Sequence, residues 1–87
     1  MKLIKITSLG CPSCIIMNNR LEEIINNYNY QVESYDYDFD NVEKYNPGNI
    51  LPVLIIESEN EKEIRRLTGE KNIEELKQFL EWCIWKK

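Results

Sequence analysis

Histidine is absent from this 87-residue chain, and long apolar runs are absent as well. Without histidine, the chain lacks the commonest general base and the commonest nitrogen ligand for metals. No run approaches the roughly 20 apolar residues that a membrane-spanning helix needs. The apolar residues of 1–6 are too few for a secretory signal, and Lys2 and Lys5 interrupt them. We therefore expect a cytoplasmic chain with no membrane partner.

Glycine and proline are also scarce, and basic residues are fewer than acidic ones. With three glycines and three prolines, no stretch resembles a linker, so residues 1–87 should form a single domain, which we expect to be a monomer. The formal net charge is −4, and no basic stripe is present, so nucleic acid is not an expected partner. One segment is locally acidic, through Glu33, Asp36, Asp38 and Asp40. It is either a solvated strand end and loop or a docking patch for a basic partner.

Hydrophobic patterning predicts four strands and three helices. The strands are expected over residues 3–7, 30–35, 53–56 and 63–67, and the helices over 12–28, 41–45 and 73–84. Asp40 with Glu43, and Asn72 with Glu75, have the spacing of helix capping boxes. A right-handed crossover makes the first two strands parallel, whereas the short turn near Ser58 makes the last two antiparallel. The order β-α-β-α-β-β-α thus predicts an α/β fold, with a mixed four-stranded sheet and helices on both faces.

The cysteine pair carries the clearest chemical signal. Cys11-Pro12-Ser13-Cys14 lies between the first strand and the first helix. In a reducing cytosol such a pair is more often redox-active or metal-binding than structural. The helix N-terminus offers N–H groups and a positive dipole end, which favour a thiolate at Cys11. Cys11 should therefore attack a substrate disulfide, and Cys14, one turn inward, should resolve the mixed disulfide. An ordinary buried pair and a metal site are the alternatives.

Two segments resemble a known superfamily. Residues 6–14, Ile-Thr-Ser-Leu-Gly-Cys-Pro-Ser-Cys, resemble the active-site strand and turn of the thioredoxin and glutaredoxin superfamily. Residues 51–53, Leu-Pro-Val, resemble its second hallmark, a cis proline before the third strand. The resemblance covers essentially the whole chain, and it implies the thioredoxin fold with sheet order 4-3-1-2 and Pro52 facing the cysteines. The substrate-binding surface that we expect consists of Leu9, Gly10, Pro12, Ser13, Leu51 and Pro52.

The chain departs from both branches of that superfamily. Lys5 stands where thioredoxins usually carry a buried acid, and Gly10 stands where they carry tryptophan. Glutaredoxins have a Gly-Gly pair and an aspartate beyond the fourth strand that help to hold glutathione, and here that region has only Gly69, followed by Glu70 and Lys71. A flavoprotein reductase is therefore expected to be a better electron donor than glutathione.

These features predict a thiol–disulfide oxidoreductase that acts on disulfide-containing proteins through Cys11 and Cys14. It should hold no bound cofactor, and its electrons should come from a thioredoxin reductase or from glutathione. The alternatives are a glutathione-dependent glutaredoxin, a Cys-x-x-Cys metal carrier of ferredoxin-like fold, and a non-catalytic interaction domain or iron–sulfur scaffold. Cys83 lies on the apolar stripe of the last helix, where it is expected to be a buried hydrophobe rather than a regulatory thiol.

Overall fold

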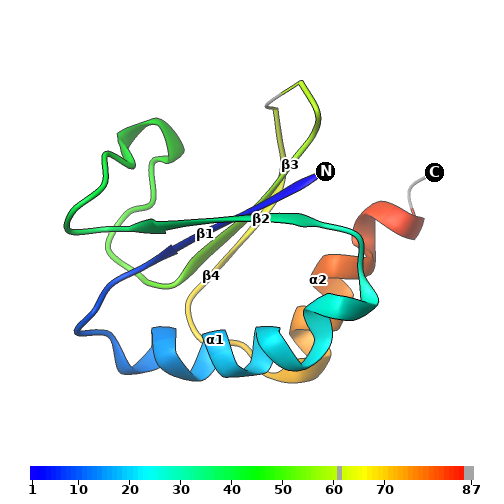
Figure 1. The fold of residues 1–87 in the computed structure, drawn as a ribbon, viewed down its shortest axis with the longest axis horizontal. Coiled ribbons are helices and arrows are strands. Elements are labelled where there is room, and N and C mark those ends of the chain that lie inside the picture. The colour runs from blue at the N-terminus through cyan, green and yellow to red at the C-terminus, as the bar shows by residue number, and fades with distance from the viewer. Residues whose placement is uncertain (61, 86–87) are drawn as a thin grey trace.

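The computed structural model describes the backbone of residues 1–60 and 62–85, and the side chains up to residue 81. The order of elements is the one predicted, with two of the expected helical segments shortened (Figure 1). The strands are β1 (Lys2–Thr7), β2 (Gln31–Asp36), β3 (Val53–Glu57) and β4 (Glu63–Thr68). The α-helices are α1 (Pro12–Ile24) and α2 (Ile73–Trp85), and the 3₁₀ helices are η1 (Ile25–Asn27) and η2 (Glu43–Tyr45). The expectation for Cys83 lies outside the described side chains.

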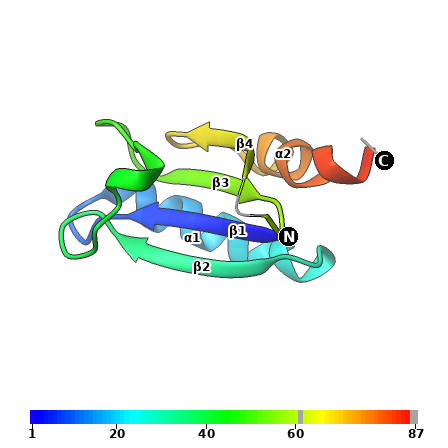
Figure 2. The same cartoon turned by 90° about the horizontal axis from the view of Figure 1, so that it is seen from above.

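The four strands form one mixed sheet in the order β2-β1-β3-β4, which is the predicted order read from the other edge (Figure 2). Strand β1 pairs with β2 in parallel and with β3 antiparallel, and β4 is antiparallel to β3. Because β1 and β2 are parallel, both end at the same edge of the sheet, and the antiparallel β3 begins there. The segments that follow β1 and β2 and the segment that precedes β3 therefore meet at one end of the molecule.

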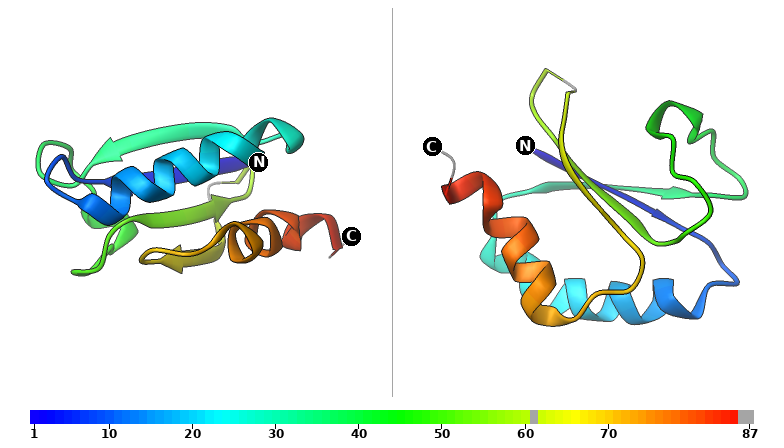
Figure 3. Two further views of the ribbon diagram at one scale, coloured as in Figure 1. Left: turned by 90° about the horizontal axis from the view of Figure 1, so that it is seen from below. Right: turned by 180° about the vertical axis from the view of Figure 1, so that it is seen from behind.

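Both α-helices pack on one face of the sheet (Figures 1 and 3). The predicted apolar stripe of α1 is buried, and it meets the apolar side of α2 over alternate residues of β1 and β3. This core consists of Leu3, Met17, Leu21, Ile24, Leu54, Ile56, Leu76, Phe79 and Leu80. Continuous burial of β3 confirms the prediction that it is a central strand.

The opposite face carries no α-helix within the part of the chain that the structure describes. Its core is Ile4, Ile6, Val53 and Ile55 of the sheet, covered by Val42 and Tyr45 from the segment between β2 and β3. The helix predicted over 41–45 is corrected to a single 3₁₀ turn, η2. It ends at Asn46, which has a left-handed φ of 49°, and Pro47 cannot continue a helix.

Two local predictions are wrong, and in the first the cause is that aspartate and asparagine side chains bond to other nearby backbone groups. The Asp40–Glu43 capping box does not form, because the Asp40 carboxylate accepts from the Asp36 N–H at 2.7 Å, while the Glu43 N–H donates to Asn41 at 3.2 Å. Helix α1 stops at Ile24 rather than at 28, and η1 follows it in an asparagine-rich stretch.

Candidate functional site

Cys11 is the N-cap of helix α1, as predicted. Its backbone is extended (φ −106°, ψ 105°), and Pro12 occupies the first helical position, where no N–H is needed. The Cys11 Sγ accepts a hydrogen bond from the backbone N–H of Cys14 at 3.2 Å, and the Cys11 carbonyl accepts from the Ile15 N–H at 3.3 Å. The sulfur thus takes the place that a serine or aspartate oxygen usually takes at a helix start.

Cys14 lies one turn further along α1 and is buried, with 1% of its surface exposed, whereas Cys11 is half-buried. Both are free thiols. Burial, together with the hydrogen bond to Cys11, raises the pKa of the Cys14 thiol to about 11. The pair therefore combines an accessible sulfur held by a helix N-terminus with a protonated sulfur beneath it.

The Leu51–Pro52 peptide bond is cis, which confirms that prediction. Pro52 directly precedes β3, and the β1–β3 register pairs Ile6 with Val53, so Pro52 lies at the edge of the sheet where β1 turns toward Cys11. Its carbonyl accepts from the Gly69 N–H at 2.9 Å, which joins the start of β3 to the segment after β4.

The predicted substrate-binding residues differ widely in exposure. Leu9 is 78% exposed, Gly10 and Pro12 are exposed, Ser13 and Leu51 are half-buried, and Pro52 is buried. A partner could therefore reach the side chains of the Leu9–Ser13 segment, while the buried Pro52 could meet it only through backbone.

Residues 36–40 lie against the segment that leads to Cys11, a contact that sequence patterns did not indicate. The Ser8 hydroxyl donates to Asp38 at 2.7 Å, and the Tyr37 N–H donates to the Thr7 carbonyl at 2.7 Å. The Cys11 N–H in turn donates to the Ser8 carbonyl at 3.3 Å. The views in Figures 1 and 2 place these two segments side by side at one end of the sheet. The aspartates of residues 36–40 therefore lie beside the segment that leads to Cys11.

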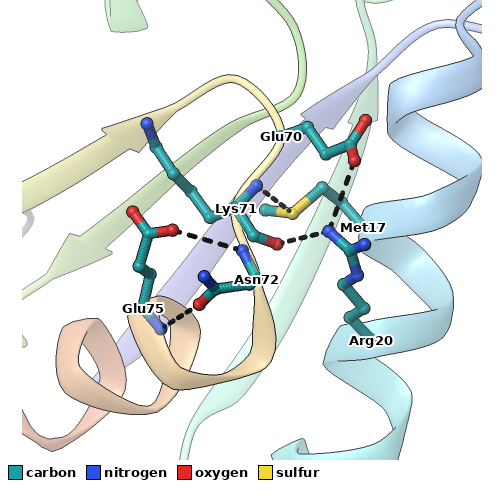
Figure 4. Close-up of polar contacts among 6 residues, drawn as sticks. All are labelled: Met17, Arg20, Glu70, Lys71, Asn72 and Glu75. Atoms are coloured by element: carbon teal, nitrogen blue, oxygen red, sulfur yellow. Dashed lines mark hydrogen bonds and ion pairs between the residues drawn. The ribbon is translucent and has the colours of Figure 1, made fainter.

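The segment between β4 and α2 is fastened to helix α1 (Figure 4). Arg20 donates to the Lys71 carbonyl at 2.7 Å and lies 3.4 Å from the Glu70 carboxylate. The Lys71 N–H points to the sulfur of Met17 at 3.1 Å. The predicted Asn72–Glu75 capping box is present, because the Glu75 N–H donates to the Asn72 side chain at 2.9 Å and the Asn72 N–H to the Glu75 carboxylate at 3.5 Å. Three backbone N–H groups around the start of α2, those of Lys71, Asn72 and Glu75, are thereby occupied.

Among the side chains up to residue 81, excluding residue 61, no group of three or more cysteine, aspartate or glutamate residues is arranged to hold a metal ion. Within the described residues, no helix is long and apolar enough to cross a membrane.

No protein-family model and no curated protein sequence matches this chain. Solved structures do match it. A reduced thioredoxin preprotein from Schistosoma mansoni superposes with a TM-score of 0.78 at 17% identity, over 92% of this chain and 75% of that one. Thioredoxin 1 from Thermosipho africanus superposes with a TM-score of 0.78 at 22% identity, over 98% of this chain and 96% of that one. The chain therefore has the thioredoxin fold.

Proposed function

We propose that this thioredoxin-fold chain is a dithiol–disulfide oxidoreductase that reduces protein disulfides through Cys11 and Cys14. The observation that carries the proposal is the hydrogen bond from the Cys14 N–H to the Cys11 Sγ at the first turn of α1. It gives one half-buried sulfur held at a helix N-terminus and a second, buried sulfur one turn away.

In the first step the Cys11 thiolate attacks one sulfur of the substrate disulfide. A new bond forms between that sulfur and Cys11, and the other substrate sulfur leaves as a thiolate. The N–H of Cys14 holds the Cys11 sulfur at the start of α1 before the attack. The half-buried position of Cys11 leaves its sulfur accessible to a partner.

In the second step Cys14 resolves the mixed disulfide. Its thiol proton leaves to the released substrate thiolate or to solvent, and the resulting thiolate attacks the sulfur of Cys11. The bond from Cys11 to the substrate breaks, so the substrate is left with two thiols and the chain with a Cys11–Cys14 disulfide. Two electrons have passed to the substrate. Because burial raises the pKa of the Cys14 thiol above its ordinary value, loss of this proton is the step that neutral pH should slow.

The two electrons are returned, in our proposal, by a flavoprotein disulfide reductase in preference to glutathione. Glutathione carries two carboxylates, and helix N-termini are ready-made sites for such anions. At α2, however, the N–H groups of Lys71, Asn72 and Glu75 already have partners within the chain. This arrangement supports a protein reductase that docks on the surface around Cys11.

The test is a turnover assay on a protein disulfide, run in parallel with a thioredoxin reductase and with glutathione as the electron donor. We expect turnover with the reductase, and none in a Cys11→Ser variant. Absence of turnover with both donors, together with tight binding of Cu(I) or Zn²⁺ by the reduced pair, would replace the proposal with the metal-carrier alternative.

A further inference from the structure

Exposed apolar side chains gather at the end of the sheet where Cys11 lies. Leu9 and Phe39 are each 78% exposed, and Ile50 is 63% exposed. Leu9 precedes Cys11 by two residues, and Phe39 follows Asp38, whose carboxylate is bonded to Ser8. Ile50 precedes the Leu51–Pro52 bond at the same edge of the sheet. Exposed apolar groups concentrated beside a reactive group are typical of a partner-binding surface.

Ile15 extends this surface onto the first turn of α1. It is 58% exposed, although it lies one turn after the cysteine that caps the helix. We call the set Leu9, Ile15, Phe39 and Ile50 the apolar surface. Such a surface fits an extended protein segment, but apolar contact alone does not select one protein over another.

The charge beside the apolar surface is negative and uncompensated. Asp36, Asp38 and Asp40 bond only to neutral donors, which are backbone N–H groups and the Ser8 hydroxyl. Within residues 1–60 and 62–81, none of these three carboxylates forms an ion pair. Each therefore contributes its full negative charge to the field at this end of the molecule.

Two cations that follow these segments in the chain, Lys44 and Arg20, are engaged elsewhere. The Lys44 ammonium lies 5.0 Å from the centre of the Tyr45 ring, and its charge acts on Glu33. Arg20 is bound to Glu70 and to the Lys71 carbonyl. The first turn of α1, which follows the N-cap Cys11, has no acidic residue.

We propose that the apolar surface and the three aspartates together dock protein segments in which the reducible disulfide is flanked by lysine or arginine. The inference rests on the proposed function and names its substrate class. Complementary charge raises the rate of encounter and fixes the register of the partner, while a partner with acidic flanks is repelled. The aspartates therefore favour substrates with lysine or arginine beside the disulfide, whereas the apolar surface alone would bind substrates of either charge equally.

The experiment compares three short peptides that contain the same internal disulfide and differ only in flanking residues, which are lysine, serine or glutamate. Single-turnover reduction by the fully reduced chain is measured at ionic strengths of about 0.01 M and about 0.5 M, where the screening length differs several-fold. Each rate is divided by the rate with dithiothreitol in the same buffer, which removes differences in the intrinsic reactivity of the peptides.

At low ionic strength we expect the lysine peptide to be reduced at least about tenfold faster than the glutamate peptide, with the serine peptide between them. At high ionic strength the ratio should fall to within about twofold. In an Asp38→Asn/Asp40→Asn variant the low-salt ratio should fall by at least about threefold. Asparagine keeps an acceptor oxygen for the Ser8 and Asp36 donors, so the fold of the segment is preserved.

The matched control is Glu22→Gln/Glu23→Gln, which removes two exposed negative charges further along α1. These residues lie roughly 16–18 Å along the helix axis from Cys11, at about 1.5 Å per residue. At about 0.01 M the screening length is about 30 Å, so the low-salt ratio should fall in this variant by clearly less than in the aspartate variant. A ratio near one in the wild-type chain, or a ratio that survives in the aspartate variant, overturns the inference and leaves the proposed function intact. Failure to reduce any of the three peptides overturns the proposed function, and the inference with it.

Discussion

The Sγ atom of Cys11 accepts a hydrogen bond from the backbone N–H of Cys14 at 3.2 Å, so the two cysteines are linked even as free thiols. The bond satisfies one of the N–H groups that a helix start leaves unpaired. The two cysteines also lie in different surroundings, since Cys11 is half-buried and Cys14 is 1% exposed. The predictions about reactivity follow from this asymmetry.

We predict that a limiting amount of iodoacetamide at neutral pH modifies Cys11 at least about tenfold faster than Cys14, because the thiolate is the nucleophile and access differs between the sites. Peptide mapping by mass spectrometry gives the two rates. A Cys14→Ser variant should still be modified at Cys11 and should accumulate mixed disulfides with substrate. Equal modification of both cysteines would contradict the roles assigned to them.

We predict that resolution by Cys14 accelerates with pH. Burial raises the pKa of this thiol above its ordinary value, so its thiolate fraction grows about tenfold per pH unit in the range below that pKa. If Cys11 is first converted to the mixed disulfide with thionitrobenzoate, attack by Cys14 releases the coloured thiol. Its rate of release should rise about tenfold between about pH 7 and pH 8, and again between about pH 8 and pH 9. A rate that levels off below about pH 8 would show that burial does not hold the proton on Cys14.

The sequence predicted those parts of the site that depend on local pattern. The stripe of Cys14, Met17 and Leu21 recurs at helical spacing, and all three are buried. The Asn72–Glu75 spacing predicted a capping box that is present. Each of these features involves residues close together in the chain, so the periodicity and propensity of a short segment suffice to find it.

The contacts around the site that were not predicted join distant segments. Ser8 and Asp38 are 30 residues apart, and their hydrogen bond depends on where two strands end in space. The same limit explains the helix expected over 41–45, because local spacing suggested a capping box at Asp40 whereas its carboxylate bonds back to Asp36. Competition between a side chain and alternative backbone donors is decided by the tertiary structure.

We predict that Asn72→Ala lowers the free energy of unfolding by about 1 kcal/mol, because α2 loses the side chain that accepts from the Glu75 N–H at 2.9 Å. Urea denaturation of the reduced protein measures the change. Asn72→Asp is the matched control, since it keeps an acceptor and places a negative charge at the positive end of the helix dipole. That variant should be at least as stable as the parent, and a loss equal to that of the alanine variant would show that the cap does not stabilise α2.

We predict that the start of α2 disfavours glutathione as the electron donor. Turnover with glutathione should be at least about tenfold slower than turnover with a thioredoxin reductase, because three of the N–H groups at the start of α2, those of Lys71, Asn72 and Glu75, already have partners and are not free for a carboxylate. In Met17→Ala the sulfur that faces the Lys71 N–H at 3.1 Å is removed, and that donor becomes available to an anion.

The variant must still fold, and Met17 belongs to the core, so circular dichroism and urea denaturation accompany the assay. Met17→Leu is the control, because it keeps the apolar volume and also removes the sulfur. If glutathione is excluded because the Lys71 N–H is occupied, that donor is free in both variants. The ratio of glutathione-dependent to reductase-dependent turnover should then be higher in both variants than in the parent chain. If the parent chain already turns over equally with both donors, the N–H groups of α2 do not govern the choice, and the chain acts as a glutathione-dependent glutaredoxin on the same fold.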